Sequence, residues 1–188
     1  MNEMTLVEAA KSGDQASLGE LYEIYYERVL QYAYRRTFDQ QVAYDITANT
    51  FVKIAEKIKK FEMRHENAFV GWLFRIASNE IIAYYRKPEK YKSSVFVDDD
   101  EVYVEETAGE LLDTAELYRQ LYISMRTLKQ KEQEVVDLYY FENMSYKEIS
   151  AATGIREGSV GVLLHRAIKK LQKTLEPLVK IEEGGITI

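Results

Sequence analysis

Apolar residues recur at spacings of three and four along three stretches of the chain, which predicts helices with one apolar face each. The stretches are residues 4–36, 40–60 and 68–86. Asp14 lies inside the first stretch where a second helix should begin, and Asp39 lies just before the middle stretch. A short acidic side chain at such a position accepts hydrogen bonds from free backbone amides, so we predict both residues as N-caps.

The middle stretch should present its apolar side chains on one side of a helix. Residues 61–67 break the helical pattern and are expected to form a loop, with Asn67 capping the helix that follows. Pro88 should end that helix, because proline cannot continue it. The spacing predicts that the apolar side of the middle helix comprises Ala48, Phe51, Ile54, Ala55 and Ile58.

A segment without helical period separates the two halves of the chain. Residues 87–116 hold three Lys and Arg against ten Asp and Glu, whereas residues 1–86 hold 11 against 12 and residues 117–188 hold 11 against nine. We interpret residues 87–113 as a solvated acidic linker. Two alternatives stay open: an isolated short strand at residues 101–107, and an acidic segment that covers a basic DNA-binding face.

The C-terminal half contains the pattern of a helix-turn-helix. One or two helices are expected over residues 114–141. Ser145 and Glu148 have the spacing of a capping box that would open a short helix, and Gly154 can take the left-handed conformation that stops it. A longer helix should then run from about residue 157 to 175. A short helix, a glycine turn and a long helix are typical of this DNA-binding motif.

The long helix has two distinct faces on a helical wheel. Arg166, Lys169 and Lys173 lie opposite its apolar stripe. A solvated surface helix would show the same basic face, but the capped helix and glycine turn before it favour DNA binding. The net charge of −6 does not oppose this, because residues 143–175 hold six basic and two acidic residues and screening limits charge effects to about 10 Å. The predicted buried stripe is Val160, Leu164, Ala167, Leu171 and Leu175.

Composition narrows the function classes. Nine glycines and two prolines in 188 residues favour long helices, and the lack of cysteine excludes disulfides and thiolate metal sites. The two histidines, His65 and His165, lie far apart, and the chain contains no phosphate-binding glycine loop. No apolar run reaches about 18 residues and the N-terminus lacks a secretory pattern, so we expect a cytoplasmic protein. We expect binding rather than catalysis, with no cofactor and no metal.

These observations predict an all-α protein of two small helical domains. Residues 1–86 should form an N-terminal helical bundle, and residues 114–188 a helix-turn-helix bundle. Residues 87–113 would join them as the acidic linker.

Four segments resemble the extracytoplasmic-function sigma factors of the sigma-70 family (group IV). The sequence WLFRIASN at residues 72–79, running on to Tyr85 and Arg86, is similar to the third conserved helix of that family. The sequence DITANTF at residues 45–51 resembles the preceding helix, which in the family grips the clamp helices of RNA polymerase. Residues 9–22 also resemble the family, and residues 128–175 resemble its promoter-binding domain.

The resemblance implies that the N-terminal domain binds core RNA polymerase and melts promoter DNA at the minus-ten element. Melting requires flipped bases to be caught by the protein, because extruding a base costs a few kcal/mol. Polar side chains could read base edges and the aromatics Phe61, Phe69 or Trp72 could stack, although a core role is the stronger expectation for Phe69 and Trp72. The implied polymerase contacts are Asp45, Asn49, Phe51 and Lys53. The implied minus-ten contacts are Arg64, His65, Asn67, Phe69, Arg75, Asn79 and Arg86.

The resemblance also implies that the C-terminal domain reads the minus-thirty-five element in the major groove. The chain departs from the family at residues 161–163, where Gly, Val and Leu replace a basic, a hydroxyl and an arginine residue. Val162 can contact a thymine methyl but cannot bind phosphate or guanine. Ala48 and Asn49 are a second departure, because the family usually has glutamine and glutamate there. The implied contacts are Ser159, Val162, His165, Arg166, Lys169 and Lys173.

Three functions remain open on the sequence. The leading one is a sigma factor that directs polymerase to a stress-related or envelope-related promoter set and has an anti-sigma partner. The second is a helix-turn-helix regulator whose N-terminal domain senses a ligand or partner. The third is a degenerate sigma-like protein that holds polymerase or another partner without reading DNA.

Overall fold

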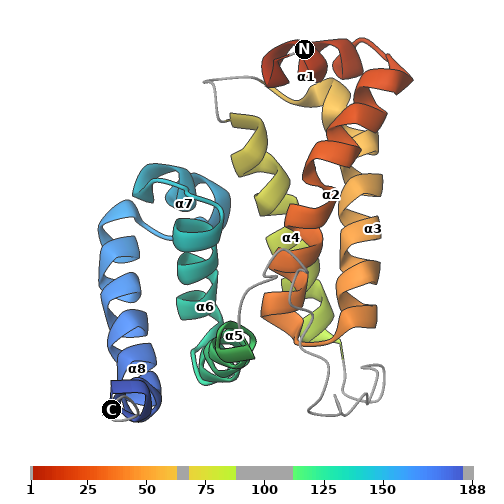
Figure 1. Ribbon diagram of the computed structural model, residues 1–188. Helices are drawn as coiled ribbons and strands as arrows, with labels where there is room; N and C mark the ends of the chain where they lie inside the picture. The colour runs from red at the N-terminus through yellow and green to blue at the C-terminus, as the bar shows by residue number, and fades with distance from the viewer. Residues whose placement is uncertain (1, 63–67, 88–111, 184–188) are drawn as a thin grey trace.

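The computed structural model describes residues 2–62, 68–87 and 112–183, and every regular element in these ranges is helical. The predicted all-α class is therefore confirmed. Figure 1 shows two groups of helices side by side, one from each half of the chain. The first group contains α1 (Glu3–Lys11), α2 (Gln15–Thr37), α3 (Gln40–Lys57), the short turn η1 (Ile58–Lys60) and α4 (Ala68–Arg86). The second contains α5 (Leu112–Arg126), α6 (Gln130–Val136), η3 (Asp137–Phe141), α7 (Tyr146–Thr153) and α8 (Glu157–Glu183).

Side-chain caps define where the helices of the first group begin. The Asp14 carboxylate accepts a hydrogen bond of 3.0 Å from the backbone amide of Ser17. The Asp39 carboxylate accepts one of 2.9 Å from the amide of Val42. Both predicted N-caps are thus confirmed. The expected cap Asn67 and the end of α4 at Pro88 lie outside the described residues.

The core of the first group lies where α2, α3 and α4 meet, and one predicted face needs correction. Ala48 and Ala55 of α3 are exposed, although the spacing predicted them on the apolar side. Thr47 and Thr50 are buried in their place, because their hydroxyls donate to the carbonyls of Ala43 and Ile46 at 2.8 and 2.7 Å. The residues of α3 that are buried are Val42, Ala43, Ile46, Thr47, Thr50 and Ile54.

The second group has the predicted helix-turn-helix at its centre. The backbone amide of Ser145 donates to the Glu148 carboxylate at 2.8 Å, and the amide of Glu148 donates to the Ser145 hydroxyl at 3.3 Å, which confirms the capping box. Gly154 ends α7 with a φ of 75°, in the left-handed region. Helix α8 extends to Glu183, beyond the predicted end near residue 175.

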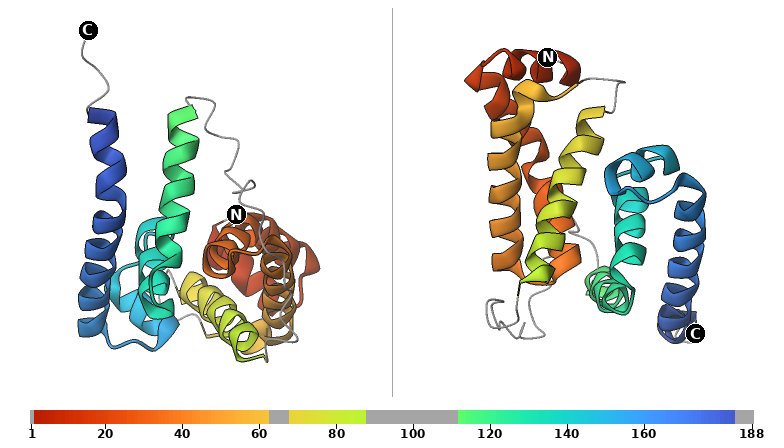
Figure 2. Two further views of the ribbon diagram at one scale, coloured as in Figure 1. Left: turned by 90° about the horizontal axis from the view of Figure 1, so that it is seen from below. Right: turned by 180° about the vertical axis from the view of Figure 1, so that it is seen from behind.

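The two groups of helices touch each other. Helix α4 packs against α7, and α2 packs against α6, so the first group contacts the helix-turn-helix directly. The two views in Figure 2 show α4 between α2 and α3 on one side and α6 and α7 on the other. The acidic linker and its two alternatives fall largely on residues 88–111, which lie outside the described residues. Within the described residues, no helix combines the length and apolar character needed to cross a membrane.

Candidate nucleic-acid interface

Helix α8 has the two faces predicted for a DNA-reading helix. Val160, Leu164, Ala167 and Leu171 are buried, and Leu175 is half-buried, so the apolar stripe packs against the rest of the helix-turn-helix. On the opposite side Val162 keeps 49% of its surface exposed. The polar residues named for this helix are also exposed: Ser159, His165, Arg166, Lys169 and Lys173. The helix therefore presents one small apolar side chain within a mainly cationic face.

The unusual Gly161 makes room for an aromatic ring. A Cβ atom added at Gly161 would lie 3.2 Å from Cε2 of Tyr146, closer than an ordinary van der Waals contact. The Tyr146 ring in turn packs on Tyr139, with 5.5 Å between the ring centroids. The sequence alone showed that the glycine is atypical, but it did not indicate that the ring of Tyr146 lies against it.

The predicted minus-ten residues are divided by the structure between the surface and the core. Arg75, Asn79 and Arg86 are exposed on α4. Phe69 is only 1% exposed and packs against Phe61, with 5.9 Å between ring centroids. This burial favours the core role for Phe69, since a buried ring cannot stack on a base. Arg64, His65 and Asn67 lie outside the described residues.

The predicted polymerase-binding residues follow one another along α3. Asp45 and Asn49 are exposed, whereas Phe51 is half-buried and meets Tyr22 of α2 edge to face, with centroids 4.7 Å apart. Lys53 forms an ion pair with Glu80 of α4, so its charge is already partly neutralised within the first group of helices. The neighbouring Val52 is exposed, an apolar surface residue that the sequence reading did not single out.

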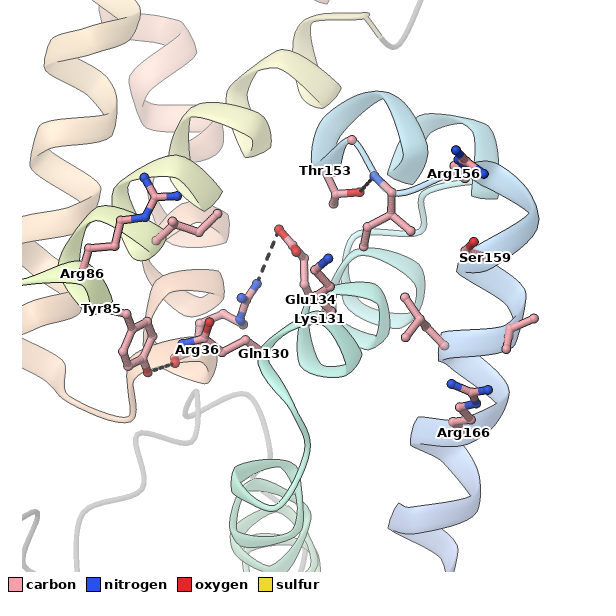
Figure 3. A pocket seen from close by; sticks show the side chains of 15 residues that line it. Arg36, Tyr85, Arg86, Gln130, Lys131, Glu134, Thr153, Arg156, Ser159 and Arg166 are labelled. Carbon is pink, nitrogen blue, oxygen red and sulfur yellow. Dashed lines mark hydrogen bonds and ion pairs between the residues drawn. The ribbon is translucent and has the colours of Figure 1, made fainter.

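A cleft of about 960 Å³ brings together residues from both halves of the chain. Its walls include Arg86 of α4, from the predicted minus-ten set, and Ser159, Val162 and Arg166 of α8, from the predicted minus-thirty-five set. Figure 3 shows Arg86 and Arg166 on opposite sides of this space. The cationic residues that line it are Arg36, Arg86, Lys131, Arg156 and Arg166, against the carboxylate of Glu134.

Next in sequence to Arg36, which lines the cleft, Arg35 of α2 and also Arg28 meet carboxylates of the second half of the chain. Arg35 Nε donates to Asp137 Oδ1 at 2.6 Å, and Arg35 Nη2 lies 3.3 Å from Glu142 Oε1. Arg28 Nη2 lies 2.9 Å from Glu142 Oε2, which joins the two ion pairs into one network. Burial raises the pKa of Asp137 above its ordinary value, against the opposing effect of the Arg35 and Arg36 charges.

A second cluster lies beside the first. The Arg36 guanidinium lies 3.9 Å from Glu134 of α6, and the hydroxyl of Ser78 on α4 donates to the same carboxylate. Burial also raises the pKa of Glu142, against the lowering effect of Arg28 and Arg35. Sequence reasoning missed both clusters, because the partners lie 56 to 114 positions apart along the chain.

Comparisons with known proteins agree with the two-part architecture. Residues 21–90 match the family described as Sigma-70 region 2, and residues 118–171 match Sigma-70, region 4. The chain is 31% identical to RNA polymerase sigma factor YlaC of Bacillus subtilis, over 85% of this chain and 92% of YlaC. It is 30% identical to ECF RNA polymerase sigma factor BldN of Streptomyces coelicolor, over 92% of this chain but only 65% of the length of BldN.

Solved structures show the same fold. The sigma factor RpoE of Bartonella quintana, solved with the anti-sigma factor NepR, matches with a TM-score of 0.68 and 22% identity, over 84% of this chain and 96% of that one. CnrH, solved with the cytosolic domain of CnrY, matches with a TM-score of 0.67 and 23% identity, over 92% and 96%. The two family matches in order, the similarity to YlaC over 92% of its length, and the similarity to BldN, show that this chain belongs to the extracytoplasmic-function sigma factors of the sigma-70 family.

Proposed function

We propose that this protein binds core RNA polymerase and directs it to a set of promoters, which it recognises and helps to melt. The observation that carries the proposal is the combination, in one chain, of a region 2 match on α2–α4 with a capped helix-turn-helix in the region 4 match. Residues 1–86 would be the polymerase-binding and minus-ten domain, and residues 114–188 the minus-thirty-five domain, joined by residues 87–113. The role is one of binding, without an enzymatic step or a cofactor.

In this proposal the exposed side of α4 meets the unpaired minus-ten strand. Arg75 and Arg86 would hold phosphates and Asn79 would read a base edge, together with Arg64, His65 and Asn67 of the preceding loop. Asparagine is a poor residue for a helix interior, so a functional reason for Asn79 is more economical than a structural one. Phe69 is left out of this set because it is buried.

Helix α8 would enter the major groove of the minus-thirty-five element. Arg166, Lys169 and Lys173 would bind phosphates, while Ser159, Val162 and His165 would face base edges. With few base-reading groups, this contact should be weak alone and only mildly dependent on sequence. When the protein is bound to polymerase at the promoter, the contact of α8 with DNA would become intramolecular, so that even a weak contact would add to promoter binding.

The polymerase contact is proposed to involve Asp45, Asn49, Phe51 and Lys53 of α3. The protein would work in the cytoplasm, where polymerase and promoter DNA are found. Because RpoE was solved with the anti-sigma factor NepR, and CnrH with the cytosolic domain of CnrY, we also propose an anti-sigma partner for this chain.

Co-purification tests the polymerase contact and separates the proposal from a ligand-sensing regulator. The tagged full chain should retain the core polymerase subunits of its host, and Asp45→Arg should weaken that retention. Glu56→Arg, an equal charge change at an exposed position on the same helix, is the matched control. Absence of core polymerase from the wild-type eluate would favour the regulator instead.

A further inference from the structure

Gly161 of α8 lies at the edge of the face proposed to read DNA. It directly precedes Val162, which keeps 49% of its surface exposed, and it lies one helical turn before the exposed His165. A side chain at position 161 would therefore project along the flank of this face, where the family resemblance implies a basic residue. Because glycine has no side chain, α8 itself supplies no contact group at this position.

The ring of Tyr146 occupies the space in which a side chain of residue 161 would begin. From the position of a Cβ atom at Gly161, the Tyr146 atoms Cε2, Cζ and Oη lie at 3.2, 3.7 and 3.8 Å. All three atoms belong to the hydroxyl end of the ring, so the polar end of the phenol is the part that lies over α8. A hydroxyl group from α7 therefore lies at the place that α8 leaves without a polar group.

The neighbouring elements fix where this hydroxyl lies. Tyr146 is the first residue of α7, directly after the N-cap Ser145, whose backbone amide and hydroxyl both donate to the Glu148 carboxylate. The ring also packs on Tyr139 of η3, with 5.5 Å between the ring centroids. Helix α7 packs against α8 and lies across its start (Figure 1). The phenol is thus positioned before DNA binds, so little side-chain entropy is lost when its hydroxyl makes a contact.

The Tyr146 hydroxyl is suited to a phosphate oxygen. Tyr146 keeps 39% of its surface exposed, and among the described residues no hydrogen bond uses its hydroxyl group. Tyrosine is one of the neutral side chains that donate hydrogen bonds to phosphate oxygens in protein–DNA complexes. In a helix-turn-helix the first helix crosses the DNA backbone while the second enters the major groove. Since Tyr146 opens the first helix, the DNA group expected beside it is a backbone phosphate.

We propose that Tyr146 is a DNA-contact residue, whose hydroxyl donates to a phosphate oxygen at the edge of the minus-thirty-five groove in place of the missing side chain of Gly161. The inference rests on the proposed function, that α8 reads duplex DNA, and adds a contact from the other helix of the motif. Gly161 and Tyr146 form one unit, in which the glycine admits the ring and the ring supplies the polar group. Because the hydroxyl is neutral, this contact releases no counterion.

Removing the hydroxyl alone tests the contact. Tyr146→Phe keeps the ring against Gly161, so the midpoint of urea denaturation should stay nearly unchanged. The affinity of the full chain for promoter duplex should fall about tenfold, as expected for one hydrogen bond to a charged group. The slope of log affinity against log salt should stay the same, because no cation is lost. Tyr140→Phe removes the hydroxyl of a more exposed tyrosine of η3 and is the matched control, with no loss expected.

A duplex with one neutral backbone position locates the phosphate. Methylphosphonate, placed at one phosphate at a time around the minus-thirty-five element, removes the charge and one acceptor oxygen at that position. At one position it should weaken the wild-type protein about tenfold more than Tyr146→Phe, because the variant has already lost the hydrogen bond to that phosphate. At the other positions the two proteins should lose affinity by equal factors.

Moving the contact group back to α8 tests whether the two positions form one unit. In a Tyr146→Ala background, Gly161→Lys should recover affinity and raise the salt slope by about one unit, because lysine brings a cation to the phosphate. With Tyr146 in place, the same Gly161→Lys substitution should gain less, since the ring lies 3.2 Å from the new Cβ atom. Equal gains in the two backgrounds would contradict the unit.

The outcomes separate this contact from the proposed function. Wild-type affinity in Tyr146→Phe, or equal losses for the two proteins at every methylphosphonate position, would overturn the contact while α8 still binds DNA. A loss in Tyr146→Phe that is confined to one promoter sequence would overturn the phosphate as its target, because phosphate contacts do not depend on sequence. Failure of the wild-type protein to bind any duplex would instead count against DNA reading by α8 itself.

Discussion

At the scale of single residues, the atypical positions have physical explanations. Gly161 leaves space for Tyr146, whose ring would otherwise meet a Cβ atom at 3.2 Å. A cation placed at position 161 would therefore have to displace this ring before it could reach a phosphate. Asn79 is exposed on a helix that is otherwise rich in buried apolar residues, in keeping with its proposed role at the DNA.

Replacing Asn79 with alanine should impair promoter melting and leave polymerase binding intact. Alanine is the better helix former, so the substitution should not weaken α4 and an effect on melting would reflect the lost amide. Permanganate reactivity of the minus-ten thymines, measured with holoenzyme, reports melting directly, and co-purification reports polymerase binding. Melting by the variant at the wild-type rate would contradict the proposed role.

Alanine at Gly161 should gain less stability than its helix propensity suggests. The propensity gain is up to about 1 kcal/mol, but the new methyl group must push Tyr146 aside. In a Tyr146→Ala background the gain should return, which a double-mutant cycle of urea denaturation can measure. Gly158 lies on the same helix with open space around it, so Gly158→Ala should change the free energy of unfolding by the same amount in both backgrounds. Equal gains for Gly161→Ala in the two backgrounds would show that the ring is no obstacle.

At the scale of the helices, the sequence correctly predicted the features that depend on residues close together in the chain. The caps Asp14 and Asp39, the Ser145–Glu148 capping box and the left-handed Gly154 all depend on neighbours within four residues. The buried face of α3 was predicted less well. The spacing of apolar residues predicted Ala48 and Ala55 on the buried face. Thr47 and Thr50 are buried there instead, and their hydroxyls donate hydrogen bonds to backbone carbonyls of the same helix.

The cationic face of α8 makes a quantitative prediction. Arg166→Gln and Lys173→Gln should each lower the slope of log affinity against log salt by about one unit, because each would remove one phosphate contact. Lys170→Gln is the matched control, since Lys170 Nζ is bound to the Glu132 carboxylate at 2.7 Å. Duplex titration of the full chain at several salt concentrations gives the slopes. A larger effect from Lys170 than from Arg166 would place the DNA on a different face.

At the scale of the whole molecule, the sequence predicted two helical halves but not their contact. Arg35 and Asp137 lie 102 positions apart, and neither stands in a pattern that marks it as the other's partner. Periodicity reports which side of a helix is buried, not which distant charge will meet it. For the same reason, the sequence could not predict that Arg86 and Arg166 line the same cleft.

Limited proteolysis should cut first within residues 90–110, since this stretch is acidic and lacks helical period. The two fragments should then elute together under native conditions, held by the buried contacts of α2 and α4 with α6 and η3. High salt should have little effect on their association, because buried ion pairs are only weakly screened. A first cut within residues 40–86 would contradict the proposed domain boundaries.

The most direct test of the central claim is promoter-specific transcription in vitro with core polymerase and this protein alone. A sigma factor should yield discrete run-off transcripts from a limited set of genomic fragments, and none should appear when either component is omitted. Starts should fall a fixed distance downstream of shared minus-ten and minus-thirty-five elements. Stable binding to core polymerase without any specific transcript would contradict the account and favour a sigma-like protein that holds polymerase without reading promoters.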